Sequence, residues 1–162
     1  MDIKAEEFLH KLQNKLPLPQ ATQVYVIFGE DDYYRSQLTA ALPDYIYGDT
    51  DEADRQITVF EKDTDISAVS EAVNTYPFFS GQSLVVLKDD KLWSKGGEEV
   101  RQTVLDKLTA LVNDVPEYCT LLISAPKLDK RTKFYKALKK AALLSIAINV
   151  LEIIAGVVMM LL

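Results

Sequence analysis

Three consecutive carboxylates, Glu30, Asp31 and Asp32, follow the apolar run 24–28, at the place where many α/β proteins bind phosphate. Carboxylate oxygens are ligands of Mg²⁺, so a metal site is one interpretation. The simpler interpretation is a helix cap, because an acidic side chain at a helix start accepts backbone N–H groups. The loop has one glycine and no Gly-Lys-Ser/Thr, and its charges repel phosphate. The sequence therefore predicts that no nucleotide binds here.

Other reactive side chains stand alone in the sequence. His10 has no carboxylate or thiol partner in a motif, and we interpret it as a surface residue. Cys119 precedes an apolar run and is expected in the core, and Trp93 is expected to pack against a strand end rather than to stack on a base. No Gly-x-Ser-x-Gly, His-Glu-x-x-His or Cys-x-x-Cys motif occurs. We therefore expect no catalytic residue, no cofactor and no metal ion.

Two adjacent aromatic residues, Phe78 and Phe79, form the strongest candidate for a binding site. They lie in a loop between Pro77 and Gly81, after a segment of helical periodicity and before a short apolar run. Neighbouring side chains on extended backbone point to opposite sides, so we expect at least one ring to face outward unless the loop folds over the core. An exposed ring on a braced loop is an anchor for another protein. The sequence does not decide which ring projects.

The elements that must position these residues alternate between strand and helix patterns. An opening helix is predicted for residues 2–15. After it, strands are predicted at 24–28, 57–60, 84–87 and 119–124, and helices at 31–42, 66–75, 98–113 and 131–140. Continuous apolar strands between amphipathic helices indicate a parallel sheet covered on both faces. The predicted fold is therefore an α/β domain with three αβα layers and a mainly parallel sheet.

Length and composition place the chain among ordinary globular domains. It has 162 residues, of which 48% are hydrophobic and 26% charged, enough for a sizeable core. One cysteine and one histidine exclude a disulfide framework and a Cys/His zinc site. The first ten residues lack the apolar run of a signal peptide. These features favour a cytoplasmic protein.

A basic segment at residues 127–140 contrasts with the acidic remainder. It holds seven cations and one acid, so the net charge of −6 divides into +6 there and −12 elsewhere. Nucleic acid is therefore not expected to bind over the general surface. One basic face could contact a phosphate backbone or an acidic partner, and the candidates are Lys130, Arg131, Lys133 and Lys136. The alternative is a solvated helix face.

The apolar tail at residues 141–162 contains one charged residue, Glu152. It fits a core strand followed by a buried helix. It also fits a membrane anchor, although a carboxylate near the bilayer centre costs about 2 to 3 kcal/mol. We expect the first and not a membrane partner.

Three passages together resemble a known family. They are VYVIFGEDDYYR at 24–35, NTYPFFSGQSLVVLK at 74–88 and SAPKLDKRTKFYKAL at 124–138. Their order and spacing resemble the delta subunit of the bacterial DNA polymerase III clamp loader, over about residues 1–142. The resemblance implies an AAA+/RecA-like domain without a functional P-loop, in agreement with the acidic loop.

The resemblance also implies a function. Residues 1–142 would be the clamp-binding domain of a subunit without catalysis of its own, working within the DNA-directed DNA polymerase holoenzyme in replication. In this family a hydrophobic pair before the third strand of the AAA+ sheet enters a pocket on the sliding clamp and helps to open the ring, which implies Phe78 and Phe79, flanked by Tyr76 and Pro77. The implied partners are the clamp, other clamp-loader subunits and, indirectly or weakly, primer-template DNA.

The chain departs from the family pattern at its tail. Family members continue into a lid domain and a helical collar, whereas residues 143–162 look like an atypical or truncated start of the lid. Two other functions stay open from the residues alone. One is a degenerate nucleotide-binding α/β enzyme, and the other is a tail-anchored adaptor.

Overall fold

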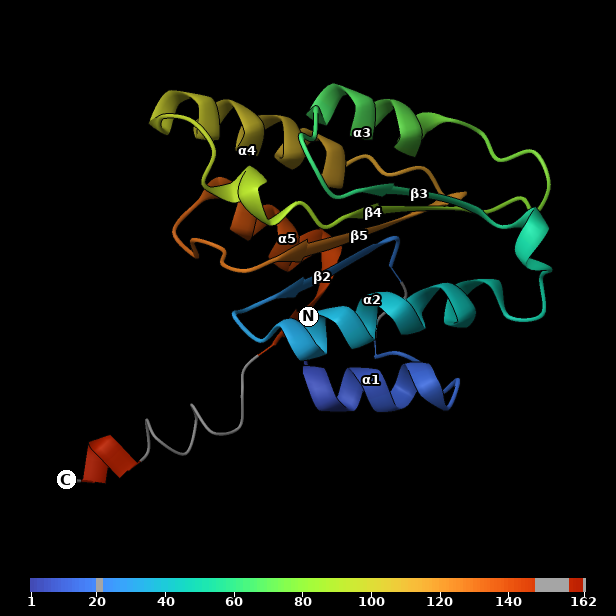
Figure 1. The fold of residues 1–162 in the computed structure, drawn as a ribbon, viewed down its shortest axis with the longest axis horizontal. Helices are drawn as coiled ribbons and strands as arrows, with labels where there is room; N and C mark the ends of the chain where they lie inside the picture. Colours follow the sequence, from blue (N-terminus) through green and yellow to red (C-terminus); the bar gives the residue numbers. More distant parts are fainter. Residues whose placement is uncertain (20–21, 148–157, 162) are drawn as a thin grey trace.

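Strands and helices alternate along the chain, as the apolar pattern predicted. The computed structural model describes residues 1–19, 22–147 and 158–161 (Figure 1). The strands are β1 (Asp2–Lys4), β2 (Val24–Phe28), β3 (Gln56–Phe60), β4 (Ser83–Leu87), β5 (Cys119–Ala125) and β6 (Ala142–Ile146). The helices are α1 (Ala5–Gln13), α2 (Asp32–Tyr47), α3 (Ile66–Asn74), α4 (Glu98–Val112) and α5 (Lys133–Ala141), with short 3-10 turns η1 (Glu52–Asp54) and η2 (Asp90–Trp93).

The strands form one parallel sheet in the order β1-β6-β2-β5-β4-β3. Each pairing is parallel, and Val24 of β2 lies between Leu121 of β5 and Ala142 of β6. Every residue of β2 and β4 is buried, because helices cover these central strands on both faces. The predicted α/β class and parallel sheet are confirmed.

Two hydrophobic layers fill the space between sheet and helices. Helices α3, α4 and α5 cover one face, and α1 and α2 cover the other (Figure 1). Alternate residues of a strand serve the two layers, so Val26 of β2 faces α3 to α5 whereas Ile27 faces α1 and α2. The three-layer prediction is confirmed.

The predicted opening helix is wrong in its first residues. Asp2–Lys4 is strand β1, with Ile3 beside Ser145 of β6, and the helix begins at Ala5. Helix α2 also continues past the predicted end, through Pro43 to Tyr47. The Tyr47 ring is buried and its hydroxyl donates to the carbonyl of Gln56 at 2.9 Å, so tertiary contacts stabilise the last turn.

The apolar tail begins as a sheet strand. β6 covers Ala142–Ile146 and pairs with β1 and β2, as the core-strand interpretation expected. The expected buried helix lies mainly in residues 148–157, outside the described part of the chain, as does Glu152. Its described end, residues 158–161, is helical but exposed, which differs from the expected burial. None of the helices that can be described is long and apolar enough to cross a bilayer. A domain boundary near residue 142 stays a prediction.

Candidate protein-binding site at the amino edge of the sheet

The loop of residues 75–82 connects α3 to β4 at the edge of the sheet where parallel strands begin. Helix α3 ends at Asn74, and the Thr75 hydroxyl donates to the carbonyl of Glu71 at 2.7 Å. Pro77 follows and does not continue a helix. Gly81 adopts φ 70°, which a glycine accepts without steric cost, and turns the chain into β4.

Both phenylalanine rings of this loop project into solvent. Phe78 is 85% exposed and Phe79 is 79% exposed, whereas Pro77 is buried. Tyr76 is exposed as well. The expectation that at least one ring faces outward is confirmed. Both rings do so, and the question of which one projects is thereby answered. A contiguous apolar surface of this kind on a monomer is typical of a protein-binding site.

The loop is held by contacts that the sequence did not reveal. Tyr76 packs edge-to-face on Tyr118, with ring centroids 5.2 Å apart, and the Tyr118 hydroxyl donates to the carbonyl of Asn74 at 2.7 Å. The Phe78 N–H lies 3.4 Å from Oε1 of Gln56, a weak hydrogen bond. Tyr118 lies 44 positions from Asn74, so no local pattern could identify it. The rings are therefore presented on a braced backbone.

At the opposite, carboxyl edge, the acidic loop after β2 is filled by its own chain. The Gly29 N–H donates to the carbonyl of Ala125 at 3.1 Å, and the Asp31 N–H donates to that of Ala147 at 3.3 Å. The Asp31 carboxylate caps α2 by accepting from the N–H of Tyr33 at 2.9 Å. The capping interpretation is thus confirmed for Asp31. These backbone donors, which would cradle a phosphate in a P-loop, are occupied.

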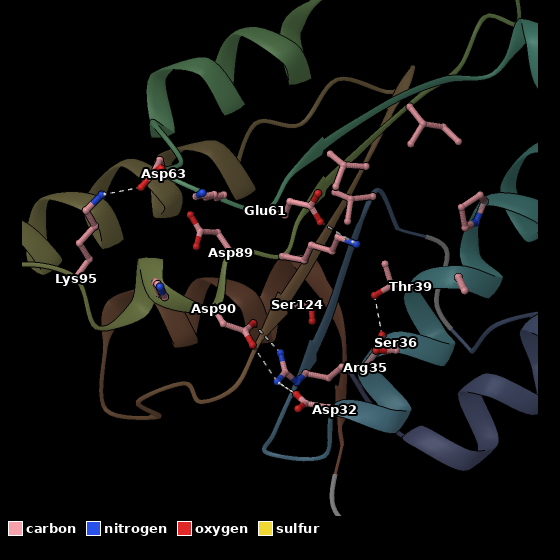
Figure 2. Close-up of a pocket in the computed structure, with 18 of the residues that line it drawn as sticks. Asp32, Arg35, Ser36, Thr39, Glu61, Asp63, Asp89, Asp90, Lys95 and Ser124 are labelled. Atoms are coloured by element: carbon pink, nitrogen blue, oxygen red, sulfur yellow. Dashed lines mark hydrogen bonds and ion pairs between the residues drawn. The ribbon is translucent and has the colours of Figure 1, made fainter.

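Arg35 pairs with the next carboxylate of that loop, Asp32. Its buried guanidinium pairs with Asp32, and Nη1 donates to Oδ1 of Asp90 at 2.8 Å (Figure 2). Glu30 is exposed. Among the residues that the structure describes, no group of three His, Cys, Asp or Glu side chains could hold a metal ion. Of the three carboxylates in the Mg²⁺ interpretation, Asp32 is thus paired with Arg35 and Asp31 caps α2.

A groove of about 1180 Å³ adjoins this ion-pair network. It runs between α2 and strands β3 and β4, and Arg35, Asp32 and Asp90 are among the residues that line it (Figure 2). Asp89 lies in its wall, and the N–H of Thr64 donates to the Asp89 carboxylate at 3.0 Å. Burial opposes ionisation of Asp89, but hydrogen bonds from Thr64 and Lys91 and the charge of Lys95 together outweigh it and lower the pKa of this carboxyl.

The predicted basic residues do not join the aromatic loop. Lys130 and Arg131 follow β5 at the carboxyl edge, and Lys133 and Lys136 are exposed on α5. Arg131 pairs with Asp129 at 3.0 Å, and its hydrogen bonds lower the pKa of Asp129 to about 2. These cations form a surface separate from the aromatic pair, so any role in DNA contact is independent of it.

The isolated side chains take the structural places that we expected. His10 is exposed on α1, with Nδ1 3.2 Å from the Asn14 amide nitrogen. Cys119 is buried, and burial raises the pKa of its thiol. Trp93 stacks on Phe134 with ring centroids 6.0 Å apart and packs against the core.

The sequence and the fold both match known proteins. The family model for DNA polymerase III, delta subunit, matches residues 25–147, which is most of the chain. The chain belongs to the DNA polymerase III delta subunit family. The matched residues include β2 through β6 and therefore both the aromatic loop and the closed acidic loop.

The sequence of one relative agrees with this assignment, and two solved structures share the fold. The DNA polymerase III subunit delta of Bacillus subtilis is 28% identical over 126 residues, which cover 74% of this chain and 35% of that protein. The solved Bacillus subtilis DNA clamp loader delta protein has a TM-score of 0.67 at 22% identity, covering 88% of this chain and 42% of that one. A DNA polymerase III gamma subunit-related protein from Thermotoga maritima has a TM-score of 0.56 at 14% identity, covering 91% and 46%. The chain thus spans less than half the length of these proteins.

Proposed function

We propose that this chain is the clamp-binding part of a clamp-loader delta subunit and that it helps to open the sliding clamp during replication. The observation that carries the proposal is the exposure of both Phe78 and Phe79 on a braced loop in a chain of this family. The rings insert together into an apolar pocket of the clamp. The chain contributes binding energy and no catalytic step.

The two rings supply enough apolar surface to anchor a specific complex. A fully buried phenylalanine removes roughly 150 to 250 Å² from water, and truncation of such an anchor costs about 2 to 4 kcal/mol. The rings are already exposed, so no rearrangement of the core precedes binding. Two anchors of this size support an affinity between about 1 μM and 1 nM.

Opening of the ring requires a further property of the contact. A partner shifts an equilibrium only by its differential affinity for the two states. The aromatic pair therefore fits the distorted clamp interface better than the closed one. The bracing by Tyr118 supports this role, because a loop that is held in place transmits strain to its partner rather than deforming itself.

The remaining partners follow from membership of the loader. Other clamp-loader subunits hold the delta subunit within the DNA polymerase III holoenzyme. Lys130, Arg131, Lys133 and Lys136 contact the phosphate backbone of primer-template DNA, and only weakly. Charge reversal of Lys133 and Lys136 should then reduce the salt dependence of DNA binding, by about one unit of slope for each phosphate that is no longer neutralised. An unchanged slope would exclude DNA as a partner of these residues.

Titration of the chain with a purified sliding clamp tests the main proposal. Phe78→Ala and Phe79→Ala are each expected to weaken binding by about 30-fold to 1000-fold. Tyr33→Ala is the matched control, because Tyr33 is an exposed aromatic residue at the opposite edge of the sheet, and it should leave the affinity within about threefold.

Folding must be measured on the same variants. Because both phenylalanine rings are exposed, their truncation should leave the free energy of unfolding within about 0.5 kcal/mol of the parent. If a folded Phe79→Ala variant binds the clamp within about 0.5 kcal/mol of the parent, the assignment of this loop is wrong.

A further inference from the structure

Strand β3 ends the sheet with an unprotected edge. It pairs with β4 on one side, and the described residues place no strand on its other side. The N–H of Lys88 donates to the carbonyl of Phe60 at 2.9 Å, so the polar groups of Phe60 face β4. Because these groups alternate along a strand, the N–H and C=O groups of Ile57 and Val59 point away from the sheet.

The side chains of β3 do nothing to discourage pairing. Gln56–Phe60 contains no charge, no proline and no glycine. Ile57 is 38% exposed and Val59 is 46% exposed, and Thr58 between them is exposed on the other face of the strand. Natural sheet edges usually carry charges, prolines or bulges that prevent strand addition. Their absence from this strand indicates that its edge has a partner.

The strand is self-complementary when it is paired antiparallel with a copy of itself. A two-fold axis through Thr58 places Ile57 opposite Val59 of the second copy, and Val59 opposite Ile57. These are the residues whose backbone groups point outward, so each opposed pair exchanges two hydrogen bonds. The two Thr58 residues face one another between those bonded pairs, where side chains approach closely.

The flanking charges are complementary in the same register. Arg55 and Glu61, which directly flank the strand, are opposed in this register, although each already has a partner in its own chain, Asp44 at 2.6 Å and Lys88 at 3.4 Å. The charges next to the strand are therefore of opposite sign when two copies pair.

We propose that two copies of this chain associate through β3, antiparallel about Thr58, and join their sheets. A second copy explains the outward backbone groups, the exposed apolar pair and the charge pattern together. A five-residue strand buries less area than a stable dimer requires. The dimer is therefore weak, with a dissociation constant between about 10 μM and 1 mM.

Sedimentation equilibrium of the whole chain, from about 10 μM to 1 mM, tests this association. Thr58→Lys and Thr58→Asp each place like charges opposite one another and should raise the dissociation constant at least about tenfold. An equimolar mixture of the two variants should recover the parent value within about threefold, because Lys and Asp are then opposed. Recovery on mixing is specific for this register.

A second pair of variants separates the strand edge from general effects on folding. Val59→Pro removes an outward N–H that the chain's own ladder does not use, and should abolish the dimer while the parent circular dichroism is kept. Val59→Thr retains the N–H and the branched shape, and should still dimerise. A parent chain that stays monomeric at about 1 mM, or charge variants that fail to associate on mixing, would overturn the proposal.

Discussion

The loops at the two edges of the sheet use their residues in opposite ways. At the carboxyl edge, the N–H groups of Gly29 and Asp31 donate to the carbonyls of Ala125 and Ala147, and the exposed Asp32 carboxylate pairs with Arg35. At the amino edge, residues 76–81 turn outward and leave two phenylalanine rings in water. One loop contributes to the stability of the fold and the other leaves apolar surface exposed. The exposed apolar surface lies at the edge where we propose that the clamp binds.

The glycines of the two loops allow the largest test of this contrast. A Cβ on Gly29 would lie 2.1 Å from the carbonyl oxygen of Ala147, at φ +136°. Gly29→Ala should therefore cost about 3 to 5 kcal/mol in the free energy of unfolding. A Cβ on Gly81 would meet nothing within 4 Å, so Gly81→Ala should cost only about 1 to 2 kcal/mol, from φ alone. Urea denaturation of both variants measures the difference, and equal losses would contradict it.

The buried cation of the closed loop gives the next largest effect. Arg35→Ala removes the ion pairs with Asp32 and Asp90 and should destabilise the fold by about 2 to 3 kcal/mol, less than a fully buried pair because both carboxylates stay in contact with water. Arg131→Ala, which breaks an exposed pair with Asp129, is the control and should cost clearly less stability than Arg35→Ala. Thermal unfolding of the two variants distinguishes them.

A test for nucleotide binding can directly contradict the contrast between the two loops. The backbone donors of Gly29 and Asp31 are occupied, so calorimetry with Mg-ATP should detect no binding by the parent chain or by Arg35→Ala. Micromolar binding by the parent would favour a degenerate nucleotide-binding enzyme and would end the description of this loop as closed.

The contacts of Tyr118 with the aromatic loop should have a smaller effect on stability and on binding. Tyr118→Phe removes the hydrogen bond to Asn74 and keeps the ring on Tyr76, and should cost about 0.5 to 1.5 kcal/mol in stability. It should also weaken clamp binding by about two- to fivefold, because the loop is less well held. Tyr45→Phe removes a comparable hydrogen bond to Leu16 and should cost similar stability without changing affinity. Equal affinities in the two variants would show that Tyr118 does not position the loop.

Acid should lower the stability of the fold through carboxylates at the carboxyl edge, and this is the smallest of the expected effects. The folded-state pKa of Asp89 is lowered, so its contribution to stability is complete above the ordinary aspartate range and is lost as pH falls through the folded pKa. Asp129, with a pKa of about 2, follows the same sign between about pH 4 and pH 2. Asp89→Asn should flatten the decline of stability in acid. A decline as steep as that of the parent would exclude Asp89 as its source.

The sequence predicted those parts of the fold whose signals are local. Val24–Phe28 is an apolar run, and Ser83–Leu87 is apolar from Leu84 onward. A central strand of a parallel sheet is buried on both faces, so such runs predict central strands. The pairing of β1 was missed because Asp2–Lys4 offers one apolar residue, and its strand character comes from β6 at the other end of the domain. Helix α2 extends beyond its predicted end at residue 42, because the contacts of Tyr47 stabilise the helix past Pro43.

The candidate site also has parts that local sequence predicted and parts that it could not predict. Adjacent phenylalanines between a proline and a glycine predicted an exposed ring from local geometry alone. The Tyr118 brace, 44 positions from its acceptor, and the ion pair of Arg35 with Asp90, 55 positions away, depend on the order of strands in the sheet. Such long-range contacts leave no periodic signal in the sequence.

The position of β6 between β1 and β2 constrains how the polypeptide is made. The amino group of Met1 donates to the carbonyl of Ala142, 141 positions further along, so the earliest residues have no strand neighbour until β6 emerges from the ribosome. At about 5 to 20 residues per second, that delay lasts roughly 7 to 28 s. Strand β1 can therefore join the sheet only after residues 142–146 have been made.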